Sequence, residues 1–346
     1  METNTSKLTY DIVIATRNRP EALAISIPLM LSSQIKPSKF IVMDSSDNHA
    51  VVQSAVQEAV KDYQGEVIIL HTNQPGTSRQ RNIGMAHSSA DIIIFPDDDS
   101  LFFNNTIDEI LRIYNLDVAM QVSGVCPAEA SYPPPEANLK QAYDQSKSET
   151  FKKAISGLRF KLERKFFLDP FLALGRELSR KHSSPEWLER ENCVCVEYMT
   201  GFRMSFRAHV IKKVKFNESF TKYGLFEDTE ASFGALQQGL LLGARNTKIY
   251  HHKFPGVRSN GQNLGFMQIF NRAYIIGKFR NDNSKIRSIF IRYALYKLFQ
   301  YALVCTGKFQ RERFLGAFKA CKQYKRLLDA RPQDIDKIYR ETTSKP

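Results

Sequence analysis

Short apolar runs alternate with longer amphipathic stretches over the first hundred residues of the chain. The apolar runs are rich in Val, Ile and Leu, as is typical of strands buried on both faces, and lie at residues 10–16, 39–43, 66–70 and 92–95. The stretches between them have helical spacing and lie at residues 17–33, 50–63 and 76–88. Strands and helices that alternate at this spacing form βαβ units. We therefore predict an α/β fold with a mostly parallel sheet flanked by helices.

Polar residues collect where these strands end. Six of them follow the first, second and fourth strands: Thr16, Asn18, Asp44, Asp97, Asp98 and Asp99. In open α/β sheets ligands bind outside the carboxyl ends of the strands, so we expect these side chains at one edge. Three adjacent carboxylates repel one another, and a divalent cation with a phosphate-bearing ligand is the usual compensation. The pattern predicts a nucleotide site; an acidic turn ahead of the next helix is the alternative.

Two arginines, Arg79 and Arg81, fall in the first turns of the helix that follows the third strand. The N-terminus of a helix carries unpaired N–H groups and a partial positive charge, both of which favour anions. We expect these arginines on an anion-facing surface, with a solvated helix face as the alternative.

The charge of the chain is uneven. The whole chain carries +13 at pH 7, yet residues 1–252 come to −1 and residues 253–346 hold 20 Lys and Arg against 6 Asp and Glu. A concentrated positive charge predicts an anionic partner for the last quarter, either a membrane surface or nucleic acid. Because no RNP, KH or helix-turn-helix pattern is evident, the anionic membrane is favoured over nucleic acid.

The composition gives no sign of export. The first eleven residues are polar and lack the apolar region of a signal peptide, and no run reaches the ~20 apolar residues of a spanning helix. The five cysteines are odd in number and include no paired CxxC zinc pattern. We expect a protein of the reducing cytoplasm.

Four ordered segments resemble family 2 glycosyltransferases of the GT-A fold, the inverting class that uses nucleotide-sugars. Residues 15–20, ATRNRP, are similar to the family's P-T-x-N-R segment except at Ala15. Asp44 matches an aspartate that ends a strand, although SSD replaces its usual continuation. Residues 80–84, QRNIG, are similar to A-R-N-x-G, and residues 97–99 match the DxD motif.

This resemblance implies roles for the residues at the strand ends. It places Asp44 and Arg81 at the nucleotide, with Thr16, Asn18 and Asp98 beside them. Asp97 would contact the ribose or the metal, and Asp99 would bind the metal, Mn²⁺ or Mg²⁺. The implied fold is the Rossmann-like GT-A sheet.

Residues further on look like the acceptor side of the same family, in which a Glu-Asp pair precedes a helix. Glu227 and Asp228 form such a pair. An inverting transfer needs one carboxylate to take the proton of the acceptor hydroxyl, and the leaving diphosphate needs a cation rather than a general acid. Asp228 is the candidate base, and acidic capping of a helix is the alternative.

A histidine pair, His251 and His252, follows an apolar run at residues 240–250. Many GT-A enzymes supply a histidine here as a third metal ligand, and imidazole suits Mn²⁺. His251 is favoured because it lies closer to the strand end, and a surface histidine pair is the alternative.

Two segments fit the family core poorly. The insertion between Cys126 and Cys195 contains a predicted basic amphipathic helix at residues 149–168. Residues 286–305 are strongly apolar, but three basic residues spread around the expected helix, so we expect it to dock with its charged heads towards anionic lipid.

The sequence thus predicts a catalytic domain at residues 7–255, with an acceptor-side insertion at 126–195, and a basic helical extension at residues 256–346. The predicted activity is metal-dependent, inverting transfer of a sugar from a nucleoside-diphosphate donor, with a UDP-sugar favoured, to a glycan or lipid-linked acceptor of the cell envelope. The predicted location is the inner face of the membrane. Two alternatives remain: a nucleic-acid- or membrane-binding protein on an inactive nucleotide-sugar fold, and a nucleotidyltransferase, which would normally show a Gly-rich phosphate loop.

Overall fold

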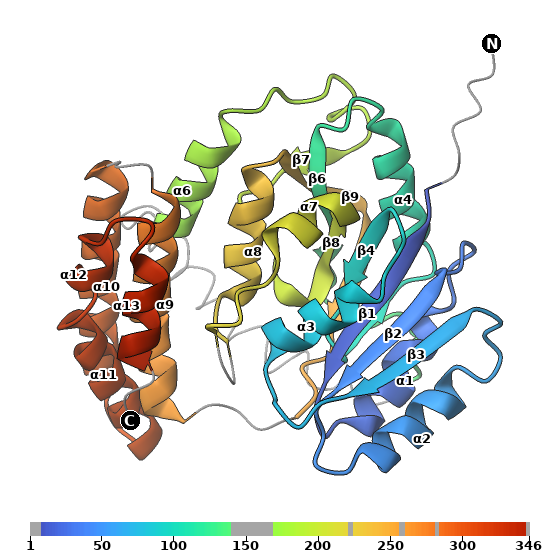
Figure 1. Cartoon of the computed structure of the whole chain (residues 1–346), viewed down its shortest axis with the longest axis horizontal. Helices are drawn as coiled ribbons and strands as arrows, with labels where there is room; N and C mark the ends of the chain where they lie inside the picture. Colours follow the sequence, from blue (N-terminus) through green and yellow to red (C-terminus); the bar gives the residue numbers. More distant parts are fainter. Residues whose placement is uncertain (1–7, 140–168, 221–223, 256–259, 281–283, 344–346) are drawn as a thin grey trace. The chain divides into compact units, whose positions relative to one another are not determined.

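The computed structural model describes residues 8–139, 169–220, 224–255, 260–280 and 284–343 (Figure 1). The chain forms two compact units, one from residues 1–142 and 179–256 and the other from residues 143–178 and 257–346. The basic helix predicted at residues 149–168 lies outside the described residues.

The first unit is built on a nine-stranded sheet of order β3-β2-β1-β4-β8-β6-β9-β5, with β7 paired to β9. The strands are β1 (Tyr10–Thr16), β2 (Lys39–Asp44), β3 (Glu66–His71), β4 (Ile92–Phe95), β5 (Ser100–Phe102), β6 (Val122–Glu129), β7 (Cys193–Cys195), β8 (Met204–Arg207) and β9 (Leu240–His251). The first four strands are parallel, as predicted. Beyond β4 the pairings are antiparallel except that of β6 with β9, so the sheet as a whole is mixed.

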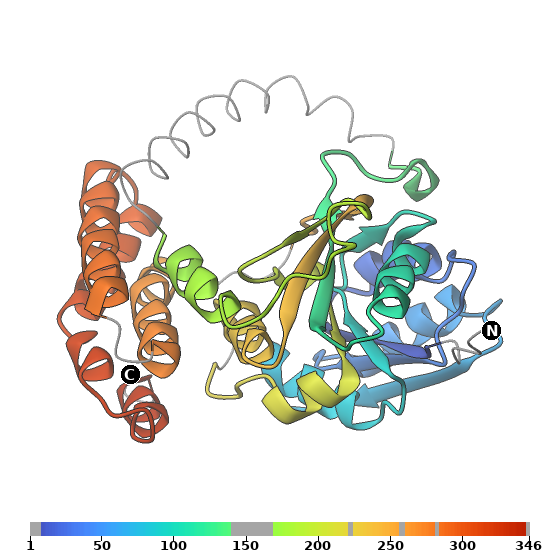
Figure 2. The ribbon, with the colours of Figure 1, turned by 90° about the horizontal axis from the view of Figure 1, so that it is seen from above.

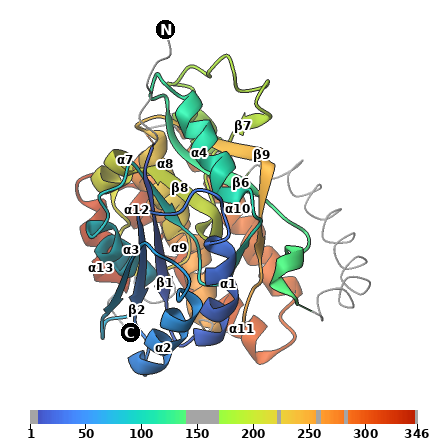
Figure 3. The same cartoon turned by 90° about the vertical axis from the view of Figure 1, so that its right-hand side faces the viewer.

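Helices cover both faces of this sheet (Figures 1 and 3). One face carries α1 (Pro20–Met30), α2 (His49–Ala59) and α4 (Thr106–Leu116), and the other carries α3 (Thr77–Ala86), α7 (Ala208–Val214) and α8 (Glu227–Leu236). Two 3₁₀ turns, η1 (Pro135–Ala137) and η2 (Gly201–Arg203), complete the unit. The α/β fold class is therefore the predicted one.

The central strands explain why the polar groups gather at one edge. The side chains of Ile12, Ile14 and Ile94 are at most 1% exposed, and burying each such side chain stabilises the fold by about 1.5–3 kcal/mol.

The order of the strands brings their carboxyl ends together. The chain adds strands on one side of β1 up to β3 and then returns to the other side of β1 with β4. The carboxyl ends of β1 and β4 meet at this reversal, where Ala15 forms a bridge with Asp97.

The described part of the second unit is helical. Its elements are α6 (Pro170–Ser179, whose last residue falls in the first unit), α9 (Gly261–Phe279), α10 (Ser284–Leu303), α11 (Lys308–Cys321), α12 (Lys325–Leu328) and α13 (Ile335–Thr343). Arg272 of α9 joins the two segments of this unit, because its guanidinium lies 4.2 Å from the centre of the Phe171 ring and 3.4 Å from Asp169 Oδ2. No helix in the described ranges is long and apolar enough to cross a bilayer.

Helices α9 and α11 approach closely because glycines line their contact (Figure 2). A Cβ atom added at Gly265 would lie 1.9 Å from the carbonyl oxygen of Arg313, and one added at Gly316 would lie 1.9 Å from that of Gln262. The backbones of the two helices are therefore in direct contact, with no room for a side chain between them.

We predict that Gly265→Ala destabilises the pairing of α9 with α11 by roughly 1–3 kcal/mol, because the methyl group forces the two backbones apart. The matched control is Gly307→Ala, where a Cβ would meet nothing within 4 Å. Hydrogen-exchange protection of the amides of both helices measures the effect. Equal protection in the two variants would contradict the tight glycine contact.

Candidate active site

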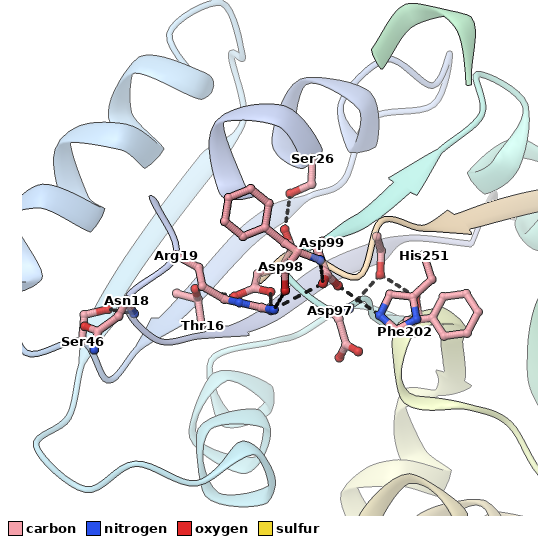
Figure 4. A network of polar contacts seen from close by, with 12 residues as sticks. Thr16, Asn18, Arg19, Ser26, Ser46, Asp97, Asp98, Asp99, Phe202 and His251 are labelled. Carbon is pink, nitrogen blue, oxygen red and sulfur yellow. Dashed lines mark hydrogen bonds and ion pairs between the residues drawn. The ribbon is translucent and has the colours of Figure 1, made fainter. Parts of the chain in front are cut away.

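The middle aspartate of the triple-Asp segment points into the protein (Figure 4). Asp98 accepts hydrogen bonds from Thr16 Oγ1 at 2.8 Å and from Arg19 Nη1 at 2.6 Å, and its carbonyl oxygen accepts one from Ser26 Oγ at 2.7 Å. Burial raises the pKa of Asp98 to about 7, against the opposing charge of Arg19. Asp98 thus ties the end of β4 to the β1–α1 turn.

The carboxylates of the two outer aspartates, Asp97 and Asp99, lie close to the side chain of His251. One oxygen each of Asp97 and Asp99 and one ring nitrogen of His251 lie within 4.8 Å of one another. Strand β5 creates this arrangement, since it pairs antiparallel with β9 in a register that sets Ser100 opposite His251. The imidazole of His251 is stacked on Phe202, with ring centres 4.6 Å apart, and its Nε2 lies 3.3 Å from Asp99 Oδ1.

This cluster has the chemistry of a divalent-cation site. Asp99 Oδ1 is buried, and no described residue donates a hydrogen bond of good geometry to it, whereas Asp99 Oδ2 accepts one from the Phe254 N–H at 2.9 Å. Burial acts to raise the pKa of Asp99, but His251, Arg19 and the Phe254 N–H outweigh it and lower that pKa, so the carboxylate is charged. A buried, charged oxygen whose neighbour at 3.3 Å is another potential metal ligand, His251 Nε2, fits a metal ion.

His252 is placed differently from its neighbour. Its backbone N–H donates to the carbonyl oxygen of Asp99 at 3.1 Å, and its ring is tilted against those of Tyr250 and Phe254. The cluster of possible ligands contains His251 and not His252 among the described residues. The structure thus brings His251 rather than His252 to the two aspartates, and its role as a metal ligand stays a prediction.

Arg81 is buried between two carboxylates. Its Nη2 lies 2.8 Å from Asp97 Oδ1 and its Nη1 lies 2.5 Å from Glu227 Oε1, while Nη2 also donates to the Gly201 carbonyl at 3.3 Å. The side chain is 1% exposed. The structure thus places this arginine between the cluster of Asp97, Asp99 and His251 and the start of α8. The two ends of its guanidinium hold the carboxylates of Asp97 and Glu227 in position.

Asp228 lies in the first turn of α8, next to that guanidinium. The Gly201 N–H donates to its Oδ2 at 2.8 Å and the Thr229 N–H to its Oδ1 at 2.7 Å. Burial raises the pKa of Asp228, although these two backbone groups favour the charged form. Oδ1 also accepts a hydrogen bond from Thr229 Oγ1 at 3.3 Å, so Oδ2 is the oxygen that has a lone pair for a further donor such as an acceptor hydroxyl.

Glu227 faces inward instead. Burial raises the pKa of Glu227 to about 8, despite the opposing charge of Arg81. It is 8% exposed and its carboxylate is bonded to Arg81. Its neighbour Asp228 is the more accessible of the two carboxylates.

Asp44 belongs to a second cluster that the sequence analysis did not foresee. Its Oδ1 accepts a hydrogen bond from the Ser46 N–H at 2.8 Å, and its Oδ2 lies 2.8 Å from His49 Nδ1. His71, at the end of β3, has its ring centre 4.7 Å from that of His49, and Asp44 and the two histidines have ligand-type atoms within 4.8 Å of one another. The only sequence signal for His71 is its place directly after a predicted strand.

Asn18 joins this cluster to the β1–α1 turn. Its backbone N–H donates to Ser46 Oγ at 2.6 Å, and its left-handed conformation, with φ 53°, aims it there. Arg19, which had no predicted role, bonds Asp98 and the carbonyl oxygen of Phe254. Nothing local in the sequence indicates this link, because its partners lie 79 and 235 residues away.

Residues 11–177 match the model of a protein family described as Glycosyl transferase family 2. This match covers slightly less than half of the chain and bears out the resemblance predicted from the four ordered segments. No curated protein sequence matches the chain.

Solved structures support the fold of this chain. It is similar to the crystal structure of GalNAc-T7 with UDP, GalNAc and Mn²⁺, with a TM-score of 0.54 and 12% identity over 97% of this chain and 59% of that chain. The chain thus spans less than two thirds of that protein, and the similarity confirms the GT-A fold. Two further solved structures are more distant. One is the mannosyltransferase PcManGT from Pyrobaculum calidifontis in complex with GDP-Man and Mn²⁺, with a TM-score of 0.47 and 12% identity over 98% of this chain and 76% of that chain. The other is S. aureus TarS, with a TM-score of 0.48 and 10% identity over 82% of this chain and 42% of that chain.

We predict that Asp99→Asn and His251→Ala each weaken Mn²⁺ binding at least tenfold, because the first replaces a charged carboxylate by a neutral amide and the second removes the ring nitrogen. His252→Ala is the matched control and should bind Mn²⁺ normally. Electron paramagnetic resonance of free Mn²⁺ during titration measures the affinity directly. A loss in His252→Ala equal to that in His251→Ala would contradict the assignment.

Proposed function

We propose that the protein is a metal-dependent, inverting glycosyltransferase that moves a sugar from a nucleoside-diphosphate donor to a hydroxyl acceptor. The observation that carries this proposal is the continuity of the polar network. Arg81 bonds Asp97 of the metal-type cluster and also the Gly201 carbonyl, and the Gly201 N–H bonds Asp228. A cation position and a candidate base therefore belong to one rigid arrangement, as transfer from a diphosphate requires.

The donor binds at the carboxyl ends of β1, β2 and β4. Asp44 and Asn18 hold the nucleoside end, and Thr16 and Asp98 fix the turn beneath it. Arg81 holds Asp97 in position through its hydrogen bond and contributes positive charge towards the diphosphate. The presence of UDP in the GalNAc-T7 structure supports a UDP-sugar.

Asp97, Asp99 and His251 would hold the divalent ion. Mn²⁺ is favoured over Mg²⁺, because the set includes an imidazole and because Mn²⁺ is present in the GalNAc-T7 structure. When bound, the ion neutralises the charge that develops on the leaving diphosphate.

Asp228 acts on the acceptor. One of its carboxylate oxygens accepts the proton of the acceptor hydroxyl while that hydroxyl oxygen forms a bond to the anomeric carbon. The bond from this carbon to the diphosphate breaks on the opposite side, which inverts the anomeric centre. The N–H groups of Gly201 and Thr229 orient the carboxylate, and Glu227 remains bound to Arg81.

The acceptor is a glycan or a lipid-linked sugar used in cell-envelope synthesis at the inner face of the membrane. The concentration of 20 basic against 6 acidic residues at positions 253–346 supports this location.

A donor-hydrolysis screen tests the function. The chain is incubated with Mn²⁺ and UDP-, GDP-, dTDP- or CMP-sugars, and release of the nucleotide is followed. We expect turnover of one nucleoside-diphosphate class, with UDP-sugars foremost, and its loss in Asp99→Asn. No turnover or donor binding with any of these sugars would overturn the proposal.

Asp228→Asn should keep donor binding and lose transfer by roughly 10²–10⁴-fold, because the amide cannot take the proton. Calorimetric titration with UDP and Mn²⁺ gives the donor affinity, and product formation with an acceptor gives the rate. Near-normal turnover would place the base elsewhere, and Glu227 and Glu230 would then be tested in turn.

A further inference from the structure

Large apolar side chains are exposed along two helices of the second unit. Seven of them, between 39% and 68% exposed, lie on α10, on α11 and in the turn between them: Leu295, Phe299, Leu303, Val304, Phe309, Leu315 and Phe318. Scattered exposed apolar residues are ordinary, but a run of this density in 24 residues marks an interaction surface.

The exposed residues of α10 form one stripe. Leu295, Phe299 and Leu303 are spaced four apart and therefore share one side of the helix. Exposed Arg292 lies on the same side, one turn before Leu295. The 20-residue helix contains four basic residues and no acidic one.

Helix α11 has a covered side and an open side. Gly316, Ala317 and Ala320 are buried, and α11 makes its most extensive packing with α9. Leu315 and Phe318 are on the open side together with the exposed Lys308, Arg311, Lys319 and Lys322. Apolar and basic residues are thus mixed here as on α10.

We propose that these exposed residues, the seven apolar side chains together with Arg292, Lys308, Arg311, Lys319 and Lys322, form a membrane-docking face that binds anionic phospholipid. Charge complementarity selects this occupant, because the five basic side chains of the face are accompanied on α10 and α11 by a single acidic residue, the partly exposed Glu312. The apolar side chains enter the boundary between headgroups and acyl chains. This inference rests on the membrane location in the proposed function, and not on the transfer reaction.

The helix α10 lies along the membrane in this arrangement. It has the ~20 residues that a spanning helix needs, but its four basic residues are spread along it and no described helix is apolar enough to cross. Nucleic acid binds basic residues and can stack its bases on phenylalanines, but it gives no reason for the exposed leucines between them.

Vesicle sedimentation of the full chain tests the face. Wild type is mixed with vesicles of phosphatidylcholine alone or with about a third phosphatidylglycerol. It should partition at least tenfold more strongly onto the anionic vesicles, since each basic residue near such a surface contributes about fivefold. Equal or absent binding to the two vesicle types overturns the proposal.

Two variants separate the contributions of the face. Leu295→Gln/Phe299→Gln/Leu303→Gln removes the apolar stripe, and Arg292→Gln/Lys308→Gln/Arg311→Gln removes charge. We expect each to lose at least tenfold in binding to anionic vesicles. The matched controls, in the first unit, are the exposed Val118→Gln and Lys61→Gln, which should bind as wild type does. Unchanged binding in the apolar variant overturns the proposal.

A tryptophan probe reports insertion. The chain has one tryptophan, so Trp187→Phe removes the native tryptophan fluorescence and leaves Phe299→Trp as the single reporter. We expect a blue shift and quenching by brominated acyl chains when anionic vesicles are added, and neither with Val118→Trp. A Phe299→Trp signal that stays unchanged on vesicles overturns the proposal.

Parallel assays identify the other occupants. Filter binding to DNA or RNA without vesicle binding would assign the face to nucleic acid and overturn the proposal. A dimer in sedimentation velocity that is lost only in the apolar variant would assign the face to a second copy of the chain and also overturn it. Donor hydrolysis should be unchanged in both face variants, and Asp228→Asn should bind vesicles normally. Failure of the donor screen with intact vesicle binding would therefore overturn the proposed function and leave this inference standing.

Discussion

The active-site arrangement depends on one buried arginine. Arg81 is held between Asp97 and Glu227, and a guanidinium without partners in such a place would be strongly unfavourable. Breaking a buried pair of this kind typically costs about 3–5 kcal/mol. The three groups therefore fix one another, and Gly201 and Asp228 are placed through the same guanidinium. Helix α3, the end of β4 and the start of α8 meet where they do because these charges must be compensated together.

The three consecutive aspartates that follow β4 contact two different sets of partners. Asp98 and Asp99 lie in a turn closed by a hydrogen bond from the Ser100 N–H to the Asp97 carbonyl oxygen at 3.1 Å, and in this turn Asp98 has different hydrogen-bond partners from Asp97 and Asp99. Asp98 is used inside the protein, where it holds Thr16 and Arg19. Asp97 and Asp99 instead lie beside His251, in the cluster proposed to hold a cation. The same short segment thus joins the sheet to α1 and forms the centre of the site.

The sequence predicted the parts of the fold that are locally encoded. β1 and β4 have the predicted bounds because continuous apolar runs leave little doubt about strands buried on both faces. β5 was not predicted, since three residues carry no periodic signal and the partner strand lies about 150 residues away. The same limit explains why Arg19 and His71 had no predicted role, because their partners are brought near only by the register of the sheet. His49 lies five residues after its partner Asp44, and no periodic signal marked that short turn. Family motifs thus named the strand-end residues but not the network that holds them.

The joining of α6 to α9 through Arg272 has a consequence for the order of events during synthesis. Phe171 leaves the ribosome 101 residues before Arg272, a delay of roughly 5–20 s at ordinary translation rates. Phe171, which is buried in the finished protein, lacks this partner during that interval. A fragment that stopped at residue 256 would never gain it, so the first unit is better isolated by removing both segments of the helical unit than by shortening the chain at its end.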